Sequence, residues 1–180
     1  TFGFLHLITD CGEFFPKFGL RIKDEEKVDI ILENNTQTKI KHIDVQDCTR
    51  SLLAMELWIN EGTEIDLSDQ LNIESGDMHR MAETANWLAY SLRELSRLLG
   101  RTDLIKELDD LRQRIIYGIK EELIDLVKIK GIGRVRARRL YRNNIKTRQD
   151  LAAASVNQLA AIDKIGMTVA NNIKSQLKVR

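Results

Sequence analysis

The strongest constraint on the fold is an internal repeat near the end of the sequence, at an offset of 33 residues. It aligns Leu126 with Leu159, Ile129 with Ile162, Ile132 with Ile165, Gly133 with Gly166, Ala137 with Ala170, and Leu140 with Ile173. In each copy, apolar residues recur at helical spacing on both sides of a glycine. Each copy therefore predicts a helix, a tight turn and a second helix, and the two together predict a small all-α domain.

The first copy has the features of a phosphate-binding turn. Its turn, Lys130-Gly131-Ile132-Gly133, contains two glycines, which allow the backbone to turn tightly and approach a ligand closely. The next helix is expected to begin near Arg134, and the free N–H groups of a helix start bind phosphate without reading bases. That helix supplies Arg134, Arg136, Arg138, Arg139 and Arg142, of which the first, third and fifth share one face. Binding to a nucleic-acid backbone is expected to be strongly salt-dependent.

The second copy departs from this pattern. Lys164 stands where the first glycine of the turn belongs, and few arginines follow it. We expect this copy to serve structure. An alternative for both copies is that they only pack as a compact helical domain, dimerise or bind a protein partner.

Charge is divided unevenly between the two parts of the chain. Residues 1–118 hold 14 Lys and Arg against 22 Asp and Glu, whereas residues 119–180 hold 14 against 5. The division near Gly118 predicts two domains, 1–118 and 119–180, and the basic one is expected to bind a polyanion. The alternative is a basic surface that is merely solvated.

The acidic part predicts a helical bundle. A helix followed by an irregular loop is expected within residues 2–22, another helix from Lys23, and a third within 47–62. A short helix at 67–71, a turn and a long helix at about 77–99 follow. Beyond Gly100, one long helix is expected from Leu104 to Leu126, with Gly118 as only a mild interruption.

The long helix at 77–99 carries two separate sets of side chains. An apolar stripe is expected to face the core, formed by Met81, Ala85, Leu88, Leu92, Leu95 and Leu99. Arg80 and Trp87 lie two turns apart, within about 20° of each other and about 100° from the centre of that stripe. An aromatic ring placed there, in register with an arginine, suits stacking on unpaired bases. The alternative for Trp87 is packing at the core boundary, and Trp58 is expected in the core.

Several functions are excluded by what the sequence lacks. It contains no phosphate loop of the Gly-x-x-x-x-Gly-Lys-Ser/Thr type and no acidic Mg²⁺-binding box, so these residues are not expected to hydrolyse ATP. Cys11 and Cys48 lie far apart, the three histidines lack metal-ligand spacing, and no cofactor is expected. No signal peptide or apolar run of about 18 residues occurs, which predicts a soluble intracellular protein. The start at Thr1 suggests a fragment of a longer chain.

Two segments resemble a known family. Ser75-Gly76-Asp77, followed by the run from Arg80 to Leu88, resembles the ratchet helix of the archaeal superfamily 2 repair helicases of the Hjm type, which are relatives of the Ski-like RNA helicases. The run from Gly131 to Arg138 resembles that family's terminal helix-hairpin-helix domain. The resemblance implies that Arg80 and Trp87 touch bases of the translocating strand. It also implies that Arg136-Ala137-Arg138 hold the exiting strand and restrain unwinding.

The resemblance further implies a parent protein, an ATP-dependent 3′–5′ DNA helicase of replication-fork repair. Its partners are single-stranded and forked DNA, its motor domains use ATP and Mg²⁺, and its location is cytoplasmic, at the nucleoid. Three alternatives stay open: the same region of a Ski-like RNA helicase, a helix-hairpin-helix protein-interaction module, and a helix-turn-helix transcription regulator using residues 67–92. The last is disfavoured because its recognition helix begins with acidic Asp77 and is devoted to an apolar stripe.

Overall fold

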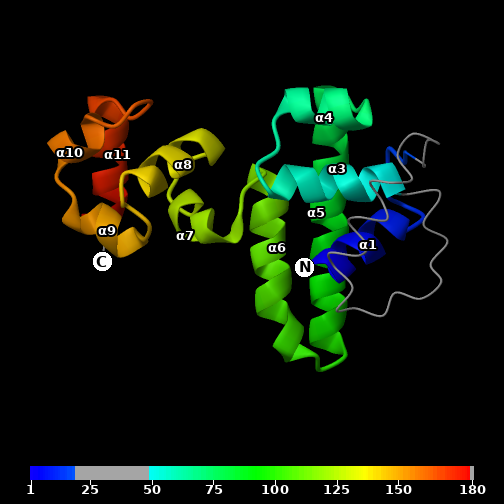
Figure 1. Cartoon of the computed structure of the whole chain (residues 1–180). Helices are drawn as coiled ribbons and strands as arrows, with labels where there is room; N and C mark the ends of the chain where they lie inside the picture. The colour runs from blue at the N-terminus through cyan, green and yellow to red at the C-terminus, as the bar shows by residue number, and fades with distance from the viewer. Residues whose placement is uncertain (19–48, 179–180) are drawn as a thin grey trace. The chain divides into compact units, whose positions relative to one another are not determined.

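The computed structural model describes residues 1–18 and 49–178, which form ten α-helices and no strand (Figure 1). The expected all-α fold class is therefore confirmed. The helix expected from Lys23 lies outside the described residues. The chain divides into two compact units, Thr1–Ile116 and Tyr117–Arg180, each with a hydrophobic core of its own.

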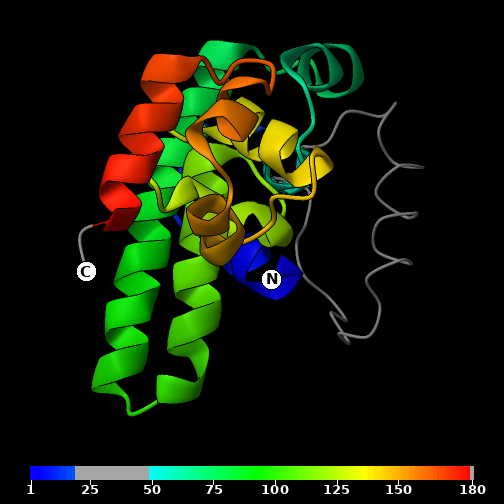
Figure 2. The same ribbon diagram turned by 90° about the vertical axis from the view of Figure 1, so that its left-hand side faces the viewer.

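The elements of the first unit run from the N-terminus to the long helical pair. They are α1 (Phe2–Asp10), α3 (Thr49–Ile59), α4 (Glu64–Leu71), α5 (Ser75–Leu98), the 3₁₀ turn η3 (Thr102–Leu104) and α6 (Ile105–Tyr117). Helices α5 and α6 lie side by side (Figure 2). The indole nitrogen Nε1 of Trp58 on α3 donates a hydrogen bond to the backbone oxygen of Ile115 on α6, at 2.7 Å. Trp58 also packs against the core, which confirms its predicted place.

The segment leading into α5 follows the predicted order of short helix, turn and long helix. Helix α4 begins after Thr63 because Thr63 and Asp66 form a capping box, in which each side chain satisfies the other's backbone N–H. It ends at Asn72, which adopts a left-handed conformation at φ +51°. Asparagine tolerates this conformation better than most residues, so it stops the helix and turns the chain into α5.

The core-facing side of α5 differs from the expected stripe. Its buried residues are Met78, Met81, Ala82, Ala85, Ala89 and Ser96. Leu95 and Leu99 are exposed, so their predicted burial is wrong. Leu95 lies in the last turn of α5, and Leu99 follows the end of the helix. The small alanines instead allow close packing in the first half of the helix.

The single helix predicted from Leu104 to Leu126 is also wrong. Helix α6 ends at Tyr117, and Gly118 takes a left-handed conformation at φ +61°, which a residue without Cβ adopts without strain. The chain resumes with the 3₁₀ turn η4 (Glu121–Leu123) and the short helix α7 (Ile124–Val127). Gly118 therefore ends a helix rather than interrupting one.

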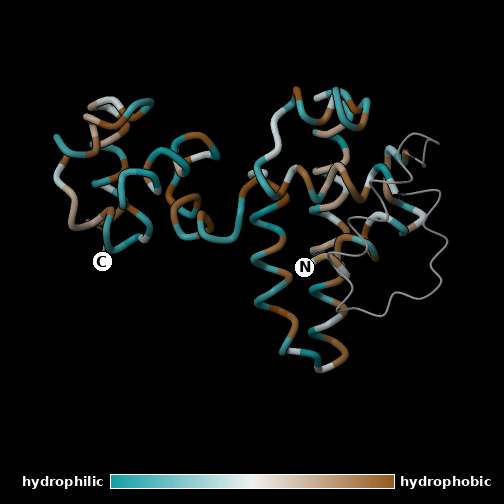
Figure 3. Tube along the Cα trace, in the orientation of Figure 1, coloured by the Kyte–Doolittle hydropathy of each residue, from teal (hydrophilic) through white to brown (hydrophobic). Residues whose placement is uncertain are grey.

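The second unit contains the repeat. After η4 and α7 it comprises α8 (Arg134–Arg142), α9 (Arg148–Ala153), α10 (Val156–Ala160) and α11 (Met167–Lys178). All ten apolar residues aligned by the repeat are buried in one core. Apolar and polar segments alternate along its trace (Figure 3). The two predicted helix–turn–helix copies are confirmed as α7–α8 and α10–α11.

Candidate nucleic-acid interface

Trp87 stands on the side of α5 that faces away from the core. At 100° per residue, it lies about 180° from the centre of the buried residues of α5, rather than the 100° expected from the apolar stripe. Its side chain is 55% exposed. The ring therefore presents an aromatic surface to solvent.

Arg80 lies on the same side of α5, two turns before Trp87. Its side chain is exposed and forms an ion pair with Asp77, three residues earlier on the helix. The Arg80 side chain is 60% exposed and that of Asp77 is 25% exposed, so solvent screens the ion pair and its contribution to stability is modest. The structure therefore places Arg80 and Trp87 on one accessible stripe, which we call the Arg80–Trp87 stripe.

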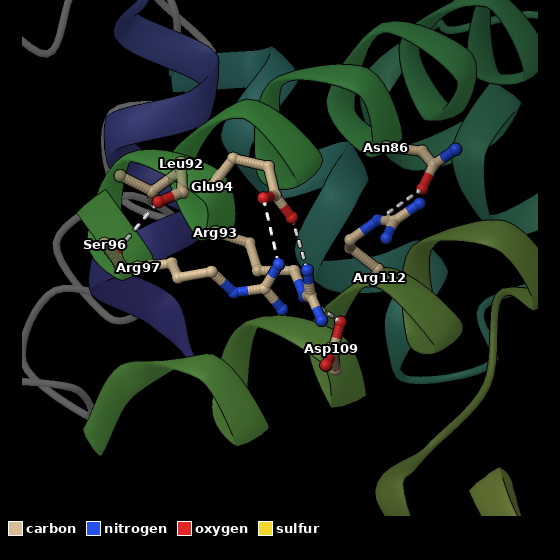
Figure 4. Close-up of polar contacts among 8 residues, drawn as sticks. All are labelled: Asn86, Leu92, Arg93, Glu94, Ser96, Arg97, Asp109 and Arg112. Carbon is tan, nitrogen blue, oxygen red and sulfur yellow. Dashed lines mark hydrogen bonds and ion pairs between the residues drawn. The ribbon is translucent and has the colours of Figure 1, made fainter. Parts of the chain in front are cut away.

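One edge of the Arg80–Trp87 stripe is bounded by polar contacts between α5 and α6 (Figure 4). Arg93 pairs with Asp109 of α6, with Nε 2.7 Å from Oδ1, and also with its neighbour Glu94. Arg112 of α6 donates from Nε to Oδ1 of Asn86 at 3.1 Å. These contacts fix the face of α5 that meets α6, and Trp87 lies outside that face.

The other edge is bounded by the segment after α1. Thr84, which lies on α5 between Arg80 and Trp87, donates a hydrogen bond from Oγ1 to the backbone oxygen of Phe15 at 3.1 Å. The Phe15 side chain is exposed. Sequence reasoning missed this aromatic residue because it lies in an irregular loop, where helical periodicity gives no signal.

The turn before α8 leaves a helix start without a side-chain cap. Gly131 has φ +92°, a conformation that favours glycine, and Gly133 occupies the N-cap position without any side chain to accept from the first amides. Helices α9 and α10 in the same unit both begin with complete capping boxes. The start of α8, which no side chain caps, is therefore suited to an external anion.

The predicted arginines of α8 have different surroundings. Arg138 donates to Oε1 of Glu122 at 2.9 Å and lies over the ring of Tyr141. Partial burial opposes ionisation of Glu122, but the hydrogen bond from Arg138, a backbone hydrogen bond and the charges of Arg138 and Lys120 together outweigh it and hold the pKa of that carboxyl below its ordinary value. Arg139 pairs with Asp163 at 3.1 Å, and both side chains are exposed.

The other candidates surround the turn. Lys130 is exposed, Arg134 is half-buried at the first turn of α8, and Arg142 is exposed at its end. Arg136 points back to the turn, where Nη1 donates to the backbone oxygen of Gly131 at 2.7 Å. The structure thus brings the turn and Arg136 together, while Arg138 and Arg139 make contacts elsewhere on the same unit.

No metal or membrane site is evident in the described part of the chain. Residues 1–18 and 49–178 contain no group of three or more His, Cys, Asp and Glu side chains arranged to hold a metal ion. No helix among them is both long enough and apolar enough to cross a membrane.

Comparison with known proteins defines the class of protein to which the chain belongs. Residues 2–118 match the family described as "Archaeal helicase, domain 4", and residues 123–179 match the "SAM-like Helix-hairpin-helix tandem". Fold and sequence together therefore describe a helicase domain followed by a tandem helix-hairpin-helix. The chain belongs to the archaeal Hel308 DNA helicase family, of which it holds domain 4 and the helix-hairpin-helix region. The resemblance found in the sequence is confirmed.

The similar relatives are named ATP-dependent DNA helicase Hel308. The Methanocella arvoryzae protein is 34% identical over 186 residues, which cover 98% of this chain and 25% of the relative. The Methanocaldococcus jannaschii protein is 34% identical over 179 residues, which cover 98% of this chain and 14% of the relative. The Pyrococcus horikoshii protein is 37% identical over 129 residues, which cover 71% of this chain and 18% of the relative. The chain therefore spans a quarter or less of the length of these relatives.

Proposed function

We propose that this chain is the single-stranded and forked DNA-binding region of an ATP-dependent 3′–5′ DNA helicase that acts in replication-fork repair at the nucleoid. Motor domains of the same parent chain use ATP and Mg²⁺ to move the DNA. The observation that carries the proposal is Trp87, which is 55% exposed on the side of α5 away from both the core and α6. Membership of the Hel308 family supports it.

Residues 1–118 form the ratchet domain in this proposal. Arg80 and Trp87 are about 10 Å apart along the axis of α5, given a rise of about 1.5 Å per residue. Trp87 stacks on an unpaired base, and Arg80 exchanges Asp77 for a phosphate of the same strand. Base stacking tolerates any sequence, which suits an enzyme that moves along DNA.

Residues 119–180 grip the backbone of the exiting strand. The start of α8, which no side chain caps, receives one phosphate beside the turn from Lys130 to Gly133, and Arg134 and Arg142 add positive charge along α8. Arg139 contributes by exchanging its exposed partner Asp163 for a phosphate. Arg138 lies at the edge of this surface, held by Glu122.

Tryptophan fluorescence tests the proposal directly. The chain is titrated with single-stranded, forked and duplex DNA of equal length at two salt concentrations, beside a Trp87→Phe variant in which only Trp58 emits. We expect single-stranded and forked DNA to quench the emission of the wild-type chain, more weakly at high salt, and to leave the emission of the variant unchanged. Equal quenching in both proteins would remove Trp87 from the site.

A second titration uses RNA oligomers of the same sequence. Phosphate contacts and base stacking do not distinguish ribose from deoxyribose, so the preference between DNA and RNA must be measured. Tighter binding of RNA at matched salt would favour the function of a Ski-like RNA helicase instead.

A further inference from the structure

The turn of the second hairpin shares a left-handed residue with that of the first, although a lysine stands there in place of glycine. Lys164 occupies the position equivalent to Gly131 and adopts φ +65°, where Gly131 adopts +92°. A residue with a Cβ pays about 1 kcal/mol or more for this left-handed conformation. Some contact in the folded protein must therefore favour it at Lys164.

That contact is made by Arg136. Its Nε donates a hydrogen bond to the backbone oxygen of Lys164 at 3.0 Å, and its Nη1 donates to the backbone oxygen of Gly131 at 2.7 Å. One guanidinium thus joins the carbonyls of two equivalent turns that lie 33 residues apart. The same residue, Lys164, thus has the left-handed conformation and accepts the hydrogen bond from Arg136.

A second contact holds the first turn from the opposite hairpin. The side-chain amide of Gln176 on α11 accepts from the backbone N–H of Lys130 at 2.9 Å and donates to the backbone oxygen of Lys130 at 2.9 Å. Both polar groups of one peptide residue in the turn are therefore bound by a single side chain. This contact and that of Arg136 come from different residues and support the same conclusion.

We propose that the second hairpin is a clamp that holds the first turn in its phosphate-binding shape, with Arg136 and Gln176 as positioning residues. The inference rests on the proposed function of the first turn, because it explains how that turn is kept ready for its ligand. A turn already ordered before binding loses less conformational entropy when phosphate arrives, so affinity rises without any added ligand contact. Arg136 acts on the DNA through Gly131, and the second hairpin needs no phosphate ligands.

Gln176→Met is the sharpest test, because it removes both hydrogen bonds to Lys130, together with those to Asn172 on the same helix, keeps the length of the side chain and changes no charge. Binding of single-stranded DNA is measured in the full chain at several salt concentrations, well below the melting temperature. We expect the dissociation constant to rise about two- to tenfold, the range for the loss of such hydrogen bonds. The slope of log affinity against log salt stays unchanged. Gln149→Met, at an exposed position of α9, is the matched control and leaves both unchanged.

Arginine variants separate positioning from direct contact. Arg142→Ala is expected to reduce the salt slope by about 0.7, as the loss of one phosphate contact does for single strands. Arg136→Ala is expected to weaken binding while keeping the wild-type slope. A slope reduced as in Arg142→Ala would make Arg136 a phosphate ligand and overturn its assignment as a clamp.

Two further results would overturn the clamp. In the first, Gln176→Met lowers the melting temperature but leaves the dissociation constant unchanged, so the contact serves stability alone. The second result comes from amide hydrogen exchange, which needs no DNA. Exchange of the Gly131 and Ile132 amides is compared between wild type and Gln176→Met. This comparison separates the clamp from the proposed function, because failure of the wild-type chain to bind DNA would refute the proposed function alone. Faster exchange in the variant supports the clamp, and equal exchange overturns it.

Discussion

Lys174 shows how one side chain joins two helices of the second unit. Its Nζ donates to the backbone oxygens of Leu151, Ala152 and Ala154, at 3.2, 2.6 and 2.7 Å. These carbonyls lie at the end of α9, where a helix leaves its acceptors unsatisfied and its dipole favours positive charge. The ammonium therefore uses all three of its donors on one helix end.

Lys174→Met is expected to destabilise the second unit. The variant keeps most of the aliphatic chain but loses charged hydrogen bonds, which contribute about 1.5 to 3 kcal/mol to the free energy of unfolding. Chemical denaturation of the full chain measures the change. Lys128→Met is the control, because the ion pair of Lys128 with Asp125, at 3.3 Å, is exposed. Equal effects of the two substitutions would contradict the role assigned to Lys174.

Asp150 makes the stability of the second unit depend on pH. The backbone N–H of Lys146 and then that of Thr147 donate to its carboxylate, both at 2.9 Å, and lower its pKa below the ordinary value of 3.8. Since the folded pKa is the lower one, the stabilisation is fully present above 3.8 and is lost as the pH falls through the folded value. Asp150→Asn should therefore flatten the acid limb of a plot of melting temperature against pH. An unchanged acid limb would contradict this.

At the scale of the helix, α5 has a buried side that packs in the core and an accessible side that is proposed to bind DNA. Trp87→Ala is expected to weaken single-strand binding roughly 5- to 150-fold, since stacking on a base contributes about 1 to 3 kcal/mol. The melting temperature should change little, because the ring contributes almost nothing to the core. Ile65→Ala on α4 removes another exposed apolar side chain and serves as the control. A large loss of stability in Trp87→Ala, with binding unchanged, would restore the core assignment of Trp87.

Helices could be predicted from the sequence where local chemistry determines them. The repeat fixed the start of α8 and the buried residues of both hairpins, because each copy must bury the same face. The burial of Leu95 and Leu99 could not be predicted, since it depends on how far neighbouring helices extend along α5. The end of α6 was missed because a glycine can either continue a helix or end it, and only its backbone angle distinguishes the two.

The candidate site was predicted in part for a similar reason. The positions of Arg80 and Trp87 on one face follow from helical geometry alone. The hydrogen bonds of Arg136 to Gly131 and Lys164 join residues far apart in the sequence, and no periodicity reports such a contact. Charge counting found the arginines of α8 but could not tell a ligand contact from an internal hydrogen bond.

At the scale of the whole molecule, two separate cores predict two separate unfolding events. Met81 is fully buried in the core of the first unit and Leu140 in that of the second. Met81→Ala and Leu140→Ala should each cost about 2 to 5 kcal/mol, through lost burial and a residual cavity. Differential scanning calorimetry of the full chain should show each substitution shifting a different transition. A single transition that both substitutions shift alike would mean that the units unfold as one.

The contact at Lys164 bears on how a duplicated motif diverges. Arg136 binds the main-chain oxygen of residue 164, and every amino acid supplies that oxygen. Selection on this contact therefore acts on the path of the backbone and not on the identity of the side chain. The left-handed conformation at residue 164 still disfavours β-branched residues and proline, so the residues that can replace glycine there are limited. Families built on such paired motifs should show more variation in the copy held through its main chain than in the copy that binds the ligand.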